Sequence, residues 1–127
     1  MTIDQNTATG ARQPVSDNYT SVVRGTIARV ILEQAVLPVV PGREAEFEEA
    51  FARAKAIIAA MPGFGGLTLS RCVERPATYL LLVQWERLED HTVGFRGSPD
   101  YQDWRALLHH FYDPFPVVEH YETVATA

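Results

Sequence analysis

The stretch Tyr79–Arg105, YLLLVQWERLEDHTVGFRGSPDYQDWR, decides the fold, because it joins one strand to two helical segments. Its first residues, 79–86, form a mostly apolar run that predicts a strand. Short helical segments are expected over 88–95 and 99–111, since Ser98-Pro99 offers a helix cap followed by a proline suited to the first turn. The stretch therefore brings aromatic rings, an imidazole and a guanidinium close together along the chain.

The sequence on both sides of this stretch supplies the remaining elements. Residues 66–75 alternate in polarity and precede a Pro-containing turn, which predicts a hairpin with the strand over 79–86. Residues 28–38 are apolar and β-branched, residues 43–60 have helical apolar spacing, and residues 117–125 alternate again. The order β-α-β-β-α-β predicts an α+β fold of the ferredoxin-like type, an antiparallel sheet with helices on one face.

The second face of this sheet also needs a cover. The strands over 28–38 and 79–85 are apolar on both sides, and so short a chain has no further element to pack against them. We therefore expect a homodimer in which the sheet of a second subunit closes a barrel. Glu33 and Gln34 interrupt the apolar strand, and one of them must face a cavity or the partner, because a buried polar group needs a hydrogen bond.

Composition limits the classes of partner. The chain has 127 residues, which predicts one domain, and a formal net charge of −5. Lys55 is its only lysine and no basic run exists, so a nucleic-acid partner is not expected.

Cysteine content and the lack of targeting or membrane-spanning patterns predict where the protein is located. Cys72 is the only cysteine, which excludes an intrachain disulfide and suits the reducing cytoplasm. No apolar run approaches the roughly 20 residues that span a bilayer, and the N-terminus does not resemble a signal peptide. Residues 1–26 are polar and weakly periodic, which predicts a flexible arm before a single domain over 27–127.

Common cofactor and metal motifs are missing. The glycine-rich segment 63–66 follows a helix and precedes a strand, so it is interpreted as a turn rather than a dinucleotide site. The four histidines, His91, His109, His110 and His120, lack the spacing of a zinc site, and no metal is expected.

Three side chains of the opening stretch are candidate catalytic groups: Trp85, His91 and Arg105. His91 shares a helical face with Leu88 and Phe95, so its imidazole is expected to point inward. An imidazole with a pKa of about 6.5 suits proton transfer near neutrality.

Each candidate also has a purely structural interpretation. Trp85 could belong to the core, His91 could be a partly exposed polar residue, and Arg105 could pair with Glu86 or Asp103. The aromatic residues of the last helical segment could simply form its apolar stripe; they are Tyr101, Trp104 and Phe111.

Four local patterns lie along the domain: Pro41-Gly42 before the first helix, the Pro62-Gly63-Phe64 turn, the Trp85-Glu86 strand end, and Phe95-Arg96-x-Ser98 leading into Trp104-Arg105. With these patterns the chain resembles the antibiotic biosynthesis monooxygenase family over about residues 28–124. The resemblance implies a dimeric α+β barrel.

One branch of that family converts anthrones or hydroxylated aromatic polyketides to quinones with O2 and no cofactor. The resemblance implies that Trp85 lines the pocket, that His91 stands at the proton-handling position where relatives carry a tyrosine, and that Arg105 stabilises an oxyanion. Leu81 replaces an asparagine of that branch. Substrate, a small aromatic molecule, is then expected to contact a wider set: Phe95, Tyr101, Trp104, Leu81, Gln34 and His120.

Two alternatives remain open. A protein of this fold can bind a small ligand without catalysis. The chain also resembles, more weakly, a haem-degrading branch whose functional positions fall near Ala35, Phe95 and Arg105, and none of these keeps the residue type of that branch.

Overall fold

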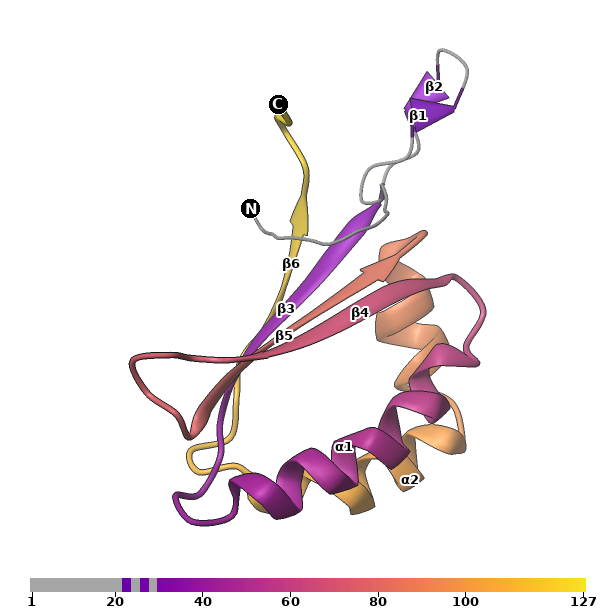
Figure 1. Ribbon diagram of the computed structural model, residues 1–127. Helices are drawn as coiled ribbons and strands as arrows, with labels where there is room; N and C mark the ends of the chain where they lie inside the picture. Colours follow the sequence, from indigo (N-terminus) through magenta and orange to yellow (C-terminus); the bar gives the residue numbers. More distant parts are fainter. Residues whose placement is uncertain (1–21, 24–25, 28–29) are drawn as a thin grey trace.

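The computed structural model describes residues 22–23, 26–27 and 30–127. Four strands form one antiparallel sheet in the order β4-β5-β3-β6: β4 Phe64–Arg71, β5 Thr78–Trp85, β3 Ile31–Pro38 and β6 Val118–Glu122. Helices α1, Glu44–Ala59, and α2, Asp100–Leu108, both lie on one face of this sheet (Figure 1). The predicted ferredoxin-like α+β fold is confirmed.

The N-terminal arm predicted over residues 1–26 falls largely outside the described residues. Its described part, together with Ile27, forms a short antiparallel pair of β1, Val22–Val23, and β2, Thr26–Ile27. Within the described ranges, none of the helices is both long and apolar enough to cross a membrane.

The two central strands, β3 and β5, are paired from Ile31 opposite Trp85 to Pro38 opposite Thr78. Because side chains alternate along a strand, one set from each strand faces the helices and the other set faces away. The set that faces the helices includes the buried core residues of both strands: Glu33, Ala35, Leu37, Tyr79, Leu81, Val83 and Trp85.

The predicted hairpin is confirmed by the pairing of β4 with β5. The first strand of the hairpin is displaced from its predicted bounds of 66–75, since it begins at Phe64 and ends at Arg71. Val73, predicted to alternate with the apolar residues of this strand, lies in the turn and is 89% exposed.

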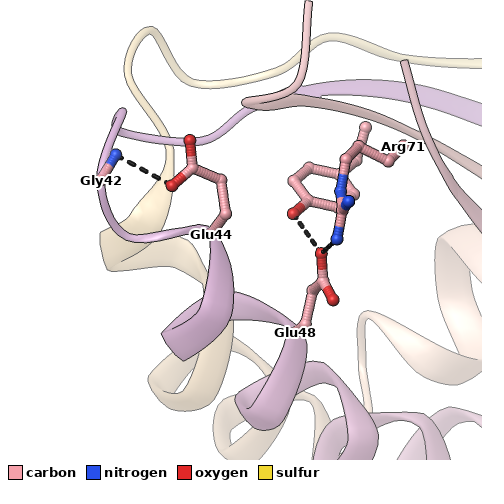
Figure 2. A network of polar contacts seen from close by, with 5 residues as sticks. Gly42, Glu44, Glu48 and Arg71 are labelled. Atoms are coloured by element: carbon pink, nitrogen blue, oxygen red, sulfur yellow. Dashed lines mark hydrogen bonds and ion pairs between the residues drawn. The ribbon is translucent and has the colours of Figure 1, made fainter. Parts of the chain in front are cut away.

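Helix α1 follows its predicted apolar spacing, with Phe47, Ala50, Phe51, Ala54 and Ile58 buried. Glu44 and Glu46 lie in its first turn, where carboxylates interact favourably with the helix dipole. Gly42 precedes the helix with a φ of 93°, a conformation that glycine adopts without strain, and its N–H donates to Glu44 Oε1 at 3.0 Å (Figure 2).

A second carboxylate of α1 ties this helix to the sheet. The hydroxyl of Tyr79, on β5, donates to Glu48 Oε2 at 2.6 Å, and Arg71, at the end of β4, forms an ion pair with the same carboxylate (Figure 2). These hydrogen bonds, first from Tyr79 and then from Arg71, lower the pKa of Glu48. We call Glu48, Tyr79 and Arg71 the helix clamp.

The connection from β5 to α2 contains a π-helical turn, η1, over Asp90–Phe95, in which the N–H of Arg96 bonds to the carbonyl of His91 at 3.1 Å. Both His91 and Phe95 are buried. Ser98 caps α2 as predicted, since its Oγ accepts from the N–H of Tyr101 at 3.2 Å and donates to the carbonyl of Phe95 at 2.7 Å. A short 3-10 turn, η2 His109–Phe111, follows α2.

The sheet face opposite the helices carries apolar side chains together with polar ones such as Gln34, and it remains open in the single chain. Val36 is 46% exposed and Tyr121 is 48% exposed on this face. Leu32, Leu80 and Leu82 lie beside them by strand alternation and are partly exposed.

Candidate active site

A cavity of about 350 Å³ lies between the helix-facing side of the sheet and the segment from η1 to the start of β6. Its lining is mostly aliphatic and aromatic, with a few titratable groups. The lining residues come from β3 and β5, from η1 and α2, and from the chain that leads to β6: Glu33, Ala35, Leu37, Leu81, His91, Phe95, Arg96, Tyr101, Trp104, His109, Tyr112, Phe115, Pro116 and Val118.

Glu33 is the acidic residue of this lining, and it is only 4% exposed. The indole Nε1–H of Trp85 donates to Glu33 Oε1 at 2.9 Å, and Nε2 of His91 lies 3.4 Å from the same oxygen. Burial raises the pKa of Glu33, although the hydrogen bond from Trp85 and the charge of Arg96 partly offset that effect.

His91 connects this carboxylate to a second imidazole. It is 3% exposed, and its ring stacks on Trp85 with a centroid separation of 5.5 Å and an interplanar angle of 18°. Its Nδ1 lies 2.7 Å from Nε2 of His120, on β6. Burial, with the charges of Arg96 and His120, lowers the pKa of His91 to about 3, so its imidazole is neutral at physiological pH. We call Glu33, Trp85, His91 and His120 the buried relay.

The guanidinium at the cavity belongs to Arg96, not to Arg105. Arg96 immediately follows η1 and lines the cavity. Its charge partly offsets the rise that burial causes in the pKa of Glu33, and it adds to the effect of burial in lowering the pKa values of His91 and His120. Arg105 lies outside the lining on the exposed side of α2, and its Nη1 donates to Gln102 Oε1 at 3.3 Å. Its neighbour Trp104 points inward, and successive helical residues are about 100° apart, so Arg105 points away.

The other site residues predicted from the sequence lie in several places. Trp85 is fully buried behind His91, His120 contacts His91 from β6, and Gln34 lies on the open face of the sheet because its neighbour Glu33 faces the helices. The remaining predicted contacts line the cavity: Leu81, Phe95, Tyr101 and Trp104.

Sequence reasoning missed Arg96, His109 and Tyr112 as cavity residues. It identified Glu33 only as one of two polar breaks in a strand. The alternation of side chains along the strand could have placed Glu33 toward the helices, because it shares its face of the sheet with Ala35 and Leu37, which belong to the core. Arg96 and Tyr112 follow segments of irregular helix, where no simple periodicity predicts the direction of a side chain.

The described residues contain no group of three or more His, Cys, Asp or Glu side chains suited to hold a metal ion. In the buried relay, Nδ1 of His91 faces Nε2 of His120, and Nε2 of His91 faces Glu33. Nδ1 of His91 and Nε2 of His120 therefore serve one another as hydrogen-bond partners, and Nε2 of His91 faces a carboxylate oxygen.

A four-stranded ferredoxin-like sheet with helices on one face and a cavity lined by both apolar and titratable side chains defines a class of small α+β proteins. Within that class, residues 30–107 match the family model described as antibiotic biosynthesis monooxygenase, and the chain belongs to this family. The uncharacterized protein YczJ of Bacillus subtilis (strain 168) is 55% identical over 95 residues, which are 75% of this chain and 100% of YczJ.

Two solved structures extend this similarity. A Bordetella bronchiseptica protein classed with the antibiotic biosynthesis monooxygenases is 39% identical, with a TM-score of 0.73 over 76% of this chain and 99% of that one. SnoaB, a cofactor-independent oxygenase from Streptomyces nogalater, is 25% identical, with a TM-score of 0.57 over 79% of this chain and 95% of SnoaB.

Proposed function

We propose that this protein is a cofactor-independent monooxygenase that oxidises a hydroxylated aromatic substrate, of the anthrone or aromatic-polyketide kind, to a quinone with O2. The observation that carries the proposal is a buried carboxylate–imidazole pair, Glu33 and His91, in the wall of an aromatic cavity. The family membership and the described activity of SnoaB support it.

The chemistry needs little from the protein beyond proton transfer and charge stabilisation. Triplet O2 reacts slowly with closed-shell molecules, but an anthrone that has lost one proton is an electron-rich enolate that can give O2 one electron. Recombination of the two radicals forms a peroxide at carbon. Loss of water from the protonated peroxide then gives the quinone, so one anthrone and one O2 yield one quinone and one water.

The cavity provides groups for each requirement. The Glu33–His91 pair can manage the proton, and the guanidinium of Arg96 can stabilise the enolate oxygen, the role that the resemblance gave to Arg105. The rings of Phe95 and Trp104 lie edge-to-face, 5.5 Å apart, and offer apolar surface to a planar substrate. A volume of about 350 Å³ falls within the range of roughly 300–1,000 Å³ typical of small-molecule sites.

The proposed active form is a homodimer that pairs the open faces of two sheets. The exposed apolar residues Val36 and Tyr121 support this arrangement, since burying such a face is favourable by about 25 cal/mol per Å² of apolar surface. Light scattering coupled to size-exclusion chromatography should give about twice the 14.2 kDa mass of one chain.

Oxygen uptake tests the proposed reaction directly. Purified protein, with no added cofactor, should consume one O2 for each anthrone converted to anthraquinone, above the background oxidation. Binding of hydroxyaromatic compounds without O2 uptake would instead support the alternative of a non-catalytic ligand-binding dimer. A shift of the Soret band on titration with haem would support the haem-degrading alternative.

A further inference from the structure

We propose that Glu33, rather than His91, is the group that accepts the hydroxyl or acidic proton of the substrate, and that His91 and His120 are positioning residues that orient its carboxylate. The inference deepens the proposed function and rests on it. It assigns the substrate-facing atom as Glu33 Oε2.

The first observation is that both ring nitrogens of His91 face other side chains. Its Nε2 lies 3.4 Å from Glu33 Oε1, and its Nδ1 lies 2.7 Å from His120 Nε2. The stack on Trp85, with a 5.5 Å centroid separation, holds the ring in that orientation. A base must be within hydrogen-bond reach of the proton that it removes, and the imidazole would have to break one of these contacts first.

The second observation concerns the two oxygens of Glu33. Oε1 accepts from Trp85 and faces His91, whereas Oε2 has no hydrogen-bond partner among the described residues. The side chain is 6% exposed and lines the cavity. A buried carboxylate oxygen without a donor is unfavourable, so a donor supplied by a ligand in the cavity would satisfy it. A phenolic or enolic hydroxyl is such a donor.

The direction of the hydrogen bonds follows from the chemistry of the partners. With Glu33 ionised, Nε2–H of His91 donates to Oε1, so Nδ1 of His91 must accept from Nε2–H of His120. The N–H groups of Trp85 and His91 then point toward the carboxylate, and the N–H of His120 points toward Nδ1 of His91. The substrate proton moves to Oε2, the O–H or C–H bond breaks, and the substrate keeps the electron pair as an anion near Arg96.

Burial strengthens this base, because it raises the pKa of Glu33, whereas it lowers the pKa of His91 to about 3 and makes the imidazole a poor proton acceptor. Titratable and charged groups face Glu33 or its cavity from every element packed around it: His91 from η1, Arg96 after η1, His120 from β6, Tyr101 from α2, and His109 and Tyr112 from η2 and the residue after it. Burial raises the pKa of Glu33, and the hydrogen bond from Trp85 and the charge of Arg96 lower it in part.

The test measures binding of 2-naphthol, a phenol that stays neutral below pH 8, to the full chain between pH 4 and 8. Wild-type binding should tighten as pH rises through the ionisation of Glu33, because the hydroxyl then donates to a carboxylate. Glu33→Gln should bind roughly 10-fold more weakly at pH 7.5 and without pH dependence, since a hydrogen bond to a charged group is worth about 1.5–3 kcal/mol. Oxygenase turnover of this variant should fall by about 10²–10⁴-fold.

The His91 variants separate a base from a positioning residue. His91→Gln retains an N–H that can reach Oε1 and should keep the pH-dependent binding. His91→Leu removes this donor and should raise the pKa of Glu33. The pH midpoint of binding and the acid limb of kcat/KM should then both move to higher pH. Glu48→Gln is the matched control, because Glu48 also accepts from an aromatic residue of β5 but lies outside the cavity lining. It should match wild type in binding and turnover.

The outcomes test the role of Glu33 separately from the proposed oxygenase function. If Glu33→Gln keeps the pH dependence of 2-naphthol binding and His91→Gln loses it, His91 is the base and the assignment of Glu33 is overturned. Absence of 2-naphthol binding by the wild type also overturns this assignment. Binding that depends on Glu33, without any O2 uptake on anthrone, supports the hydroxyl-acceptor role of Glu33 and overturns the oxygenase function. Thermal melting confirms that each variant is folded.

Discussion

Strand β5 carries an aromatic hydrogen-bond donor at each end, and the two donors meet glutamates in contrasting environments. Tyr79 donates to Glu48, whose carboxylate also pairs with Arg71 and is partly exposed. Trp85 donates to Glu33, which is buried with a neutral imidazole beside it. The pKa of Glu48 is lowered and the pKa of Glu33 is raised.

The comparison shows that the aromatic donor alone does not decide the role of a carboxylate. The hydrogen bond from Tyr79, a second one from the cationic Arg71 and access to water keep Glu48 ionised, and Glu48 serves as a structural contact of the helix clamp. Burial and a neutral partner leave Glu33 with an oxygen available to the cavity. Carboxylates with raised pKa values in cavities are candidates for acid–base catalysis, whereas exposed ion pairs seldom are.

The arginines near the two glutamates should differ most in their effect on activity. Arg96→Gln should lower turnover of an anthrone by about 10²-fold, because removal of a donor that stabilises a developing oxyanion has effects of that order. Arg71→Gln should leave turnover unchanged, since its partner Glu48 lies outside the cavity lining. Steady-state oxygen uptake measures the turnover of both variants. Equal losses of turnover would contradict the different roles given to Arg96 in the cavity and Arg71 in the helix clamp.

The aromatic donors should differ in their effect on stability. Trp85→Phe leaves a buried carboxylate oxygen without its N–H donor and removes core volume, so the free energy of unfolding should fall by about 3 kcal/mol. Tyr79→Phe removes a hydroxyl bonded to a partly hydrated carboxylate and should cost about 1 kcal/mol. Urea denaturation at pH 7 compares them, and a larger loss for Tyr79→Phe would contradict the assigned environments.

The sequence predicted those features of the two regions that follow from the regular spacing of side chains along strands and helices. Strand alternation and helical spacing predicted the sheet, both helices and the buried side of His91, and Ser98 was identified as a cap. The predicted cation, Arg105, stands nine positions after Arg96, the arginine that lines the cavity. The sequence did not indicate Arg96, because no simple periodicity predicts the direction of a side chain that follows a π-helical turn.

Glu33 illustrates a second limit. Its position as a polar break in an apolar strand indicated that either it or Gln34 must face a cavity, and strand parity could have selected Glu33. The hydrogen bond that it accepts from Trp85 and its proximity to His91 join residues 52 and 58 positions apart in the sequence. Such contacts depend on the register of β3 against β5, which the sequence of one strand does not encode.

Two glycines with positive φ extend the comparison to the backbone. Gly63, with a φ of 85°, packs against Asp90 at the start of η1, and a Cβ at this position would overlap the Asp90 carboxylate. Gly63→Ala should therefore cost about 2 kcal/mol or more, and it should also reduce turnover by displacing the turn that carries His91.

Gly42 is the matched position beside the helix clamp. Its φ is 93°, but a Cβ there would meet no atom within 4 Å, so Gly42→Ala should cost only the backbone strain, about 1 kcal/mol, without loss of turnover. Denaturation and oxygen-uptake measurements on both variants test the pair. Wild-type activity in Gly63→Ala would show that the position of η1 is not set by this contact.

The pH dependence of stability should separate the two regions by the window in which each acts. His91 has a folded-state pKa of about 3 against an unfolded value near 6.5, so the unfolded chain binds more protons between these values. The stability due to neutral His91 is complete above pH 6.5 and falls by about 1.4 kcal/mol per pH unit as pH decreases. Glu33 opposes this loss above pH 4.5, because its pKa is raised, and the lowered pKa of Glu48 adds a loss only below pH 4.5.

His91→Gln should therefore flatten the decline in stability between pH 6.5 and 4.5, whereas Glu48→Gln should change it only at lower pH. Urea denaturation at steps of half a pH unit measures both variants. An unchanged slope in His91→Gln would mean that the imidazole is protonated in the folded protein, and the hydrogen bonds of the buried relay would then run from a charged His91 to both of its partners.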